Sequence, residues 1–150
     1  MQIKISKTLQ QSLTICLTVL FCWALFITSA WAAEKAIEVK VSLGNAAGEL
    51  KFFPNNLEFK VGQPYKLVLN NPSPVKHYFT AKDFADASWT KNVKSSKVEV
   101  KGAIHEIELK PTGEATWQFI PMQAGTYELH CSIPGHAAAG MKGEIKLIDG

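Results

Sequence analysis

The chain contains no arginine: all 16 basic residues are lysines, set against 13 acidic residues. Arginine is the side chain that recognises phosphate through two parallel hydrogen bonds, so its absence argues against a site built on such recognition. The lysines also form no basic stripe of the kind that nucleic-acid binders carry. A nucleic-acid partner is therefore not expected.

Acidic residues are missing from the first 32 positions, which carry two lysines and then an apolar run, 13–27. Small residues follow, including the triplet Ala30-Trp31-Ala32. A positive segment, an apolar segment and an A-x-A site predict a secretory signal peptide, 1–32, cleaved after Ala32. The alternative is an uncleaved membrane anchor, but the run is shorter than the ~20 residues that span a bilayer. Residues 33–150 are enough for one domain.

Cysteine is also scarce, with three in the chain. Cys16 and Cys22 leave with the predicted signal peptide, so Cys131 is the only cysteine of the exported domain. Exported proteins mostly use cysteines in pairs, and a single one indicates an intermolecular bridge or a thiol with a special role. Cys131 is therefore the first candidate for a functional residue.

Short segments that alternate between apolar and polar residues recur after the leader, separated by turn residues. Alternation with a period of two is typical of strands with one buried face. This spacing predicts an all-β fold, a two-sheet Greek-key β-sandwich of about seven to eight strands, with a barrel as the alternative. A short helix is expected only within 81–87. The candidate strand segments are 37–42, 48–53, 57–61, 65–70, 75–81, 97–101, 104–110, 115–120, 126–131 and 143–148.

The segment 127–141 holds three side chains that bind soft or borderline metals: Cys131, His136 and Met141, spaced C-x4-H-x4-M. A thiolate, an imidazole and a thioether suit copper, and two histidines and a cysteine with a weak axial methionine form the blue-copper site. The second histidine must come from elsewhere, and His77, just after the 70–74 turn, is the natural supplier. The alternative is a structural cysteine, a satisfied histidine and a core methionine without a metal.

Segments 130–141 and 70–79 together resemble the copper-binding elements of cupredoxins, the plastocyanin- and azurin-like type 1 blue copper proteins. The C-x4-H-x4-M spacing is most similar to that of rusticyanin and auracyanin, since plastocyanins have a shorter loop. The resemblance implies one type 1 copper ion, with His77 as the upstream ligand and Cys131, His136 and Met141 as loop ligands. It also implies that the ring edge of His136 reaches the surface and passes the electron on.

One residue departs from the plastocyanin-like pattern: His130 stands where an aromatic residue often precedes the cysteine. In copper nitrite reductases, a histidine at that place serves a second copper at a subunit interface. Strand alternation, however, points His130 away from Cys131, so an ordinary exposed histidine is expected. His105 shares the parity of Ile107 and is expected to face inward as a satisfied structural histidine.

Two other features have two interpretations each. Asn71, six residues before His77, is a turn residue or an amide that ties the two ligand segments together; we favour the turn. The small residues of 137–140 are loop filler or part of an apolar docking patch around His136.

The sequence therefore predicts an exported, monomeric one-electron carrier, located in the periplasm or an equivalent lumenal compartment, and not an enzyme. Redox partner proteins are expected to dock near His136, with membrane contact only through an uncleaved leader. A copper-delivery protein is the first alternative. A copper-dependent reductase with a second metal at His130 is the second, although four protein ligands would leave its copper no open position.

Overall fold

The computed structural model describes residues 35–96, 98–101 and 104–150. The predicted signal peptide, 1–32, lies outside the described residues. Residues 35–150 belong to one compact unit. In the described part of the chain, no helix is both long enough and apolar enough to cross a membrane.

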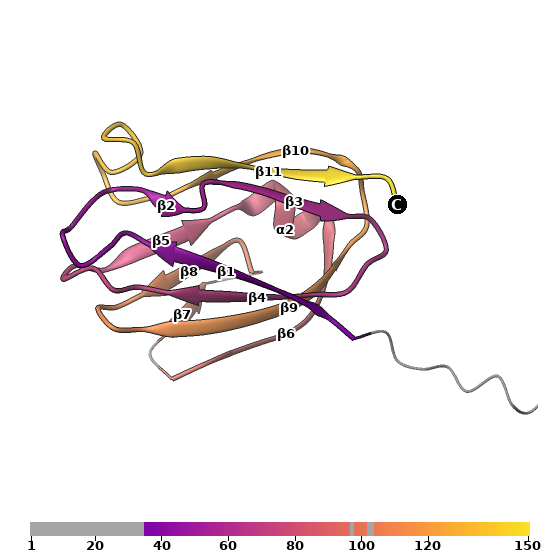
Figure 1. The fold of residues 1–150 in the computed structure, drawn as a ribbon, viewed down its shortest axis with the longest axis horizontal. Coiled ribbons are helices and arrows are strands. Elements are labelled where there is room, and N and C mark those ends of the chain that lie inside the picture. The colour runs from indigo at the N-terminus through magenta and orange to yellow at the C-terminus, as the bar shows by residue number, and fades with distance from the viewer. Residues whose placement is uncertain (1–34, 97, 102–103) are drawn as a thin grey trace, which may run out of the picture. The chain divides into compact units, whose positions relative to one another are not determined.

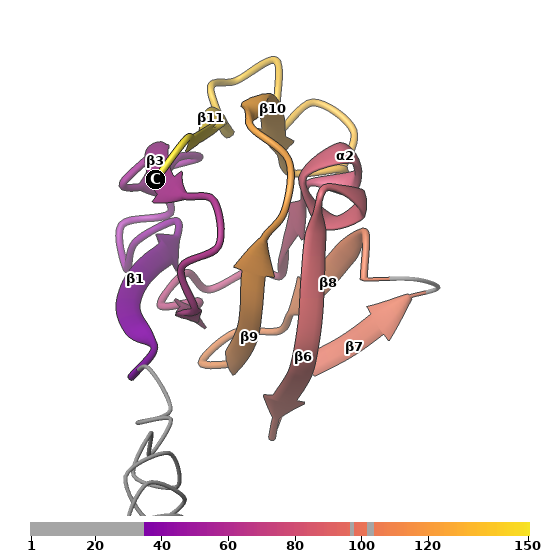
Figure 2. The ribbon, with the colours of Figure 1, turned by 90° about the vertical axis from the view of Figure 1, so that its right-hand side faces the viewer.

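The described residues form two β-sheets (Figures 1 and 2). The five-stranded sheet has the order β2-β1-β4-β9-β6, and the six-stranded sheet has the order β3-β11-β10-β5-β8-β7. A short helix, α2 (Lys82–Asp86), contacts β6 of one sheet and β10 of the other. The strands are β1 (Ile37–Leu43), β2 (Phe52–Phe53), β3 (Asn56–Lys60), β4 (Tyr65–Asn70), β5 (His77–Thr80), β6 (Ser88–Ser95), β7 (Val98–Lys101), β8 (Glu106–Leu109), β9 (Glu114–Pro121), β10 (Gly125–His130) and β11 (Lys142–Ile148).

Alternating side chains place the inner face of each sheet in one core. Along β9, Ala115, Trp117 and Phe119 are buried, and the residues between them are more exposed. The same alternation buries Leu67 and Leu69 on β4. Because strand side chains alternate between faces, these sequences can fold only with those residues inward.

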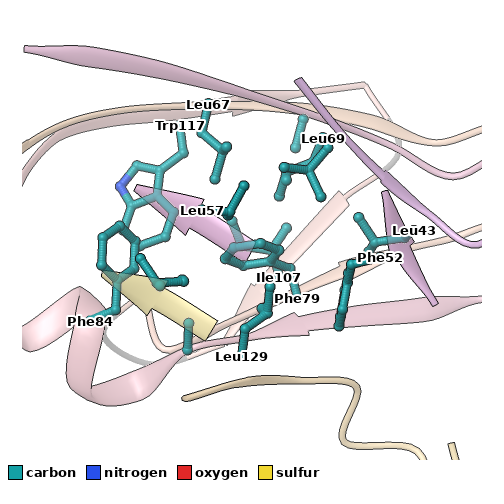
Figure 3. Close-up of a cluster of buried hydrophobic side chains, with 14 of the residues drawn as sticks. Leu43, Phe52, Leu57, Leu67, Leu69, Phe79, Phe84, Ile107, Trp117 and Leu129 are labelled. Carbon is teal, nitrogen blue, oxygen red and sulfur yellow. The ribbon is translucent and has the colours of Figure 1, made fainter. Parts of the chain in front are cut away.

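Aromatic rings fill the middle of the core. Phe84 of α2 lies edge-to-face on Trp117 at 5.3 Å and on Phe119 at 5.2 Å between ring centroids. Figure 3 shows Trp117 and Phe84 at one end of the cluster, and Phe52 with Leu43 at the other. Phe52 contacts Phe79 of the opposite sheet. Deleting a buried ring of this size typically costs about 3–5 kcal/mol, so the core forms a rigid base for the loops.

The directions of the strands bring the ends of several strands to one pole of the sandwich. β1 runs parallel to β4, so the ends of both strands lie at the same pole. β10 runs antiparallel to β5 and to β11, so the end of β10 lies near the starts of the other two. In Figure 1 this pole is on the left, where the loop between β10 and β11 projects. The predicted metal ligands all lie at this pole.

The two-sheet all-β prediction is confirmed, and the expected helix within 81–87 is α2. The described residues contain eleven strands rather than seven to eight, and one of them, β6, was not expected from the sequence. Its register shifts between Thr90 and Asn92, so Lys91 bulges out and breaks the alternation. The segment expected at 48–53 is reduced to β2.

Candidate metal centre

The loop between β10 and β11 is closed by its own backbone. Cys131 is the first residue after β10, and Met141 is the last before β11. The amide of Cys131 donates to the carbonyl of Met141 at 3.1 Å, and the amide of Met141 donates to that of His136 at 2.9 Å. The amide of His136 in turn donates to the carbonyl of Ile133 at 3.0 Å. These bonds hold the three predicted loop ligands in one tight turn.

His77 comes from the neighbouring strand of the same sheet, as the first residue of β5. The turn before it is organised by Asn71, which is 1% exposed. The Asn71 side-chain amide donates to the carbonyls of Val75 at 2.8 Å and Leu109 at 2.9 Å, and its oxygen accepts from the amide of Ser73 at 3.0 Å. The favoured turn role of Asn71 is confirmed, and these bonds anchor the turn to the end of β8.

Three donor atoms meet where the two segments approach. The sulfur of Cys131 lies 4.0 Å from Nδ1 of His77 and 3.5 Å from Nδ1 of His136. Each of the three residues has a donor atom within 4.8 Å of those of the other two, and no other such group of His, Cys, Asp and Glu occurs within 35–96, 98–101 and 104–150. Met141, from the same loop as Cys131 and His136, is fully buried. Its backbone is hydrogen-bonded to the backbone of both residues.

Burial differs among these residues in a functionally relevant way. His77 and Cys131 are buried, whereas His136 is only partly buried. The ring centroids of the two histidines are 5.2 Å apart. His136 is therefore the donor residue of this trio that reaches solvent, as expected from the sequence.

The environment keeps both buried donors uncharged until a metal binds. Burial, together with a smaller contribution from the nearby His136, lowers the pKa of His77 to about 4. Burial raises the pKa of the Cys131 thiol; the amides of Ile133 and Tyr78 oppose this shift and Glu106 adds to it. Neutral imidazole is the metal-binding form, and the thiol must lose its proton when a metal binds.

Comparison with known proteins identifies the family. The family model "Copper binding proteins, plastocyanin/azurin family" matches residues 39–148, most of the chain. The chain belongs to this family. The cupredoxin resemblance noted in the sequence is thereby confirmed, and copper is the metal of this cupredoxin.

Two relatives of known sequence support the assignment. The chain is 33% identical over 126 residues to a chloroplastic plastocyanin of Fritillaria agrestis, covering 83% of this chain and 69% of the relative. It is 30% identical over 118 residues to the copper-resistant cuproprotein CopI of Rubrivivax gelatinosus, covering 76% and 68%. Neither name denotes an enzyme, in agreement with the prediction that this cupredoxin is not one.

Solved structures show the same fold. A dithionite-reduced auracyanin of Roseiflexus castenholzii superposes with a TM-score of 0.54 at 19% identity, covering 75% of this chain and 98% of the other. A multicopper oxidase of Pediococcus acidilactici superposes with a TM-score of 0.59 at 15% identity, covering 82% of this chain but only 28% of the oxidase. The likeness to the oxidase is therefore that of one domain.

The donor set of the cupredoxin fits copper. Two imidazole nitrogens and a free cysteine, with a thioether next in the loop, are the ligands that blue-copper sites use. Nε2 of His77 is buried and has no hydrogen-bond partner among the described residues. The other ring nitrogen, Nδ1, faces the sulfur of Cys131 at 4.0 Å, as a ligand nitrogen should.

The remaining two histidines lie outside the donor cluster. His130 is on the outer face of β10, with its side chain 33% exposed and Nδ1 3.1 Å from a carboxylate oxygen of Glu128. His105 does not face inward as expected. It precedes β8 in a turn, is 31% exposed, and its Nε2 lies 2.7 Å from a carboxylate oxygen of Asp86. His105 is nevertheless hydrogen-bonded, as expected of a satisfied histidine, and its structural role stays a prediction.

Two contacts at the centre have no signal in the sequence. The amide of Tyr78 donates to the sulfur of Cys131 at 3.4 Å. Gly44, at the end of β1, lies against the ring of His77. The first contact uses the backbone and the second depends on a residue without a side chain, so neither appears in a pattern of ligand-type residues.

Proposed function

We propose that this cupredoxin is an exported one-electron carrier with a single type 1 copper bound by His77, Cys131, His136 and Met141. The observation that supports the proposal is the cluster of His77 Nδ1, Cys131 Sγ and His136 Nδ1 between two segments fixed by the core. When bound, copper supplies the redox chemistry by alternating between Cu(I) and Cu(II). Four protein ligands leave no position open for a substrate, which favours a carrier over a reductase.

Each residue has a separate task in this proposal. His77 and Cys131 are buried, so the packing around them restricts the movement of their donor atoms. The amide of Tyr78 withdraws charge from the sulfur by a hydrogen bond. Met141 would supply a weakly bound thioether. His136 is partly exposed and forms the route from the buried centre to the surface.

The surface around His136 suits docking to a redox partner. Pro134, Gly135 and Ala138 are exposed beside it and carry no charge. An uncharged apolar surface beside His136 would suit contact with a partner protein. Transfer through His136 would need only close contact at this surface.

Copper loading tests the proposal. The purified domain, 33–150, is expected to bind one copper per chain and to show intense visible absorption when oxidised, because the thiolate of Cys131 transfers charge to Cu(II). The Cys131→Ser variant is expected to lose that absorption. Two coppers per chain, or a colour that survives the substitution, would falsify the proposal.

The similarity to CopI, named a copper-resistant cuproprotein, favours copper handling as a second candidate. The distinction is kinetic. A carrier is expected to keep its copper against an excess of Cu(I) chelator while exchanging electrons rapidly at an electrode. A copper-handling protein is expected to release the metal to the chelator within the same time. Measuring both rates on one preparation separates the two.

A further inference from the structure

Glu106 connects the outer face of the six-stranded sheet to the ligand loop. It is the first residue of β8, and it is half-buried on the face opposite the core residues Ile107 and Leu109. It stands in register with Thr80 on β5. Thr80 is in turn opposite His130, the residue before Cys131. One strand, β5, therefore separates Glu106 from the end of β10.

The carboxylate of Glu106 is held by two hydroxyls. Its Oε2 accepts a hydrogen bond from Ser132 Oγ at 2.5 Å and one from Thr80 Oγ1 at 3.2 Å. Ser132 follows Cys131 directly. The bond therefore holds the carboxylate of Glu106 beside the residue that follows the proposed thiolate ligand. The loop can move away from Glu106 only if this hydrogen bond breaks.

A fixed negative charge near a redox site favours its more positive state. Oxidation of the proposed site adds one positive charge, which a nearby carboxylate stabilises by Coulomb attraction. The bond to Ser132 holds this carboxylate beside the residue that follows Cys131. The amide of Tyr78 acts on the sulfur in the opposite direction, because a hydrogen bond to the thiolate withdraws electron density. The two contacts therefore oppose each other on one sulfur atom.

We propose that Glu106 lowers the reduction potential of the centre by its negative charge. Its hydrogen bond to Ser132 holds that charge close to Cys131, so Glu106 acts as a positioning residue. This inference rests on the proposed function, since it assumes a redox-active metal at Cys131. A partly exposed charge is screened, so its removal is expected to change the equilibrium between the oxidised and reduced forms by about three- to tenfold. Tenfold corresponds to about 59 mV for a one-electron couple.

Glu106→Gln is the principal test. Glutamine keeps the shape, and its amide oxygen still accepts from Ser132 and Thr80, so only the charge is lost. Glu58→Gln is the matched control, because Glu58 is exposed on the same face of the same sheet, on β3. Ser132→Ala keeps the charge and removes the bond. The reduction potential of each copper-loaded variant is measured at an electrode, together with its visible spectrum.

The expected result is a raised potential in Glu106→Gln with an unchanged spectrum, a smaller shift in Ser132→Ala and none in Glu58→Gln. Equal potentials for Glu106→Gln and Glu58→Gln, or a shift in Ser132→Ala as large as that in Glu106→Gln, would overturn the charge role. If Glu106→Gln fails to fold, Thr80→Lys replaces it as the test. The lysine ammonium beside the intact carboxylate should also raise the reduction potential. An unchanged potential contradicts the inference. A wild-type protein without visible absorption would instead refute the proposed function.

Discussion

Gly44 lies so close to His77 that a Cβ at position 44 would be 3.1 Å from Nε2 of the imidazole. The same Cβ would be 3.1 Å from the carbonyl oxygen of Glu49 and 3.2 Å from Cβ of Ser73. The backbone at Gly44 has a φ of +74°. The end of β1 therefore limits how far the buried edge of His77 can move.

A side chain at position 44 is expected to shift His77 and alter the metal site. Gly44→Ala should change the visible spectrum of the copper-loaded protein and speed copper loss to a chelator, since the imidazole must move by a few tenths of an ångström. Gly48→Ala is the matched control: Gly48 has a φ of +77°, so the backbone strain is alike, but an added Cβ would meet nothing within 4 Å. Identical spectra for the two variants would show that Gly44 does not position His77.

Met141→Leu tests the axial ligand. Leucine fills the buried space of methionine but offers no donor, and the loss of a donor destabilises Cu(II) more than Cu(I). The variant should keep its copper and its colour while its reduction potential rises. Electrochemistry on the purified protein measures this, and an unchanged or lowered potential counts against an axial role for Met141.

The metal-free protein is expected to lose stability in mild acid through His77. Burial lowers the pKa of His77 to about 4, below the usual histidine value of 6.5. Between these two values the unfolded chain binds a proton that the folded chain does not, so the free energy of unfolding falls as the pH falls from 6.5 to 4. The loss totals about 3 kcal/mol, at 1.36 kcal/mol per pH unit.

Urea unfolding of the metal-free protein at several pH values measures this loss. Carboxylates also titrate in this range, so the His77 contribution is the difference in slope between the wild type and His77→Gln. Equal slopes in the two proteins would mean that His77 is protonated as easily in the folded state as in the unfolded state.

The donor cluster could be predicted because its chemistry is local. Cys131, His136 and Met141 lie within eleven consecutive residues, and only a few residue types bind copper. The choice of His77 needed no more than its place after a turn, and the structure brings it to Cys131. Alternation likewise predicted most strands, since burial of one face leaves a period of two in the sequence.

What the sequence did not predict depends on pairing between distant strands. The contact of Gly44 with His77 joins the end of β1 in one sheet to the start of β5 in the other. The bond of Glu106 to Ser132 follows from the pairing of β8 with β5 and of β5 with β10. β6 escaped notice because the bulge at Lys91 shifts its alternation by one residue. His105 was misplaced because a turn precedes β8, so the parity of the strand does not extend to it.

His130→Ala separates the carrier from an enzyme with a second metal. His130 faces outward beside Glu128, and no group of three metal-binding side chains surrounds it in the described part of the chain. The variant should therefore bind one copper per chain, with the spectrum and potential of the wild type. Metal analysis decides this. A loss of bound metal, or of a nitrite-reducing activity present in the wild type, would favour the enzyme.

The route of the electron is tested by placing a charge beside His136. Ala138 is exposed in the loop between β10 and β11. In Ala138→Asp, the new carboxylate would have to lose its water on docking, and burying an unpaired charge is costly. Transfer to the physiological partner should therefore slow, whereas transfer to a small inorganic oxidant should slow much less and the spectrum should change little.

Ala124→Asp supplies the matched control for this charge. Ala124 is also exposed, but it precedes the start of β10, at the opposite end of the strand that leads to Cys131. Its substitution adds the same charge to the protein without approaching His136, so neither rate should fall. Stopped-flow kinetics with both reactants compares the variants. If Ala138→Asp slows both reactions together, the copper site itself was disturbed; if it slows neither, partners dock elsewhere and His136 is not the exit.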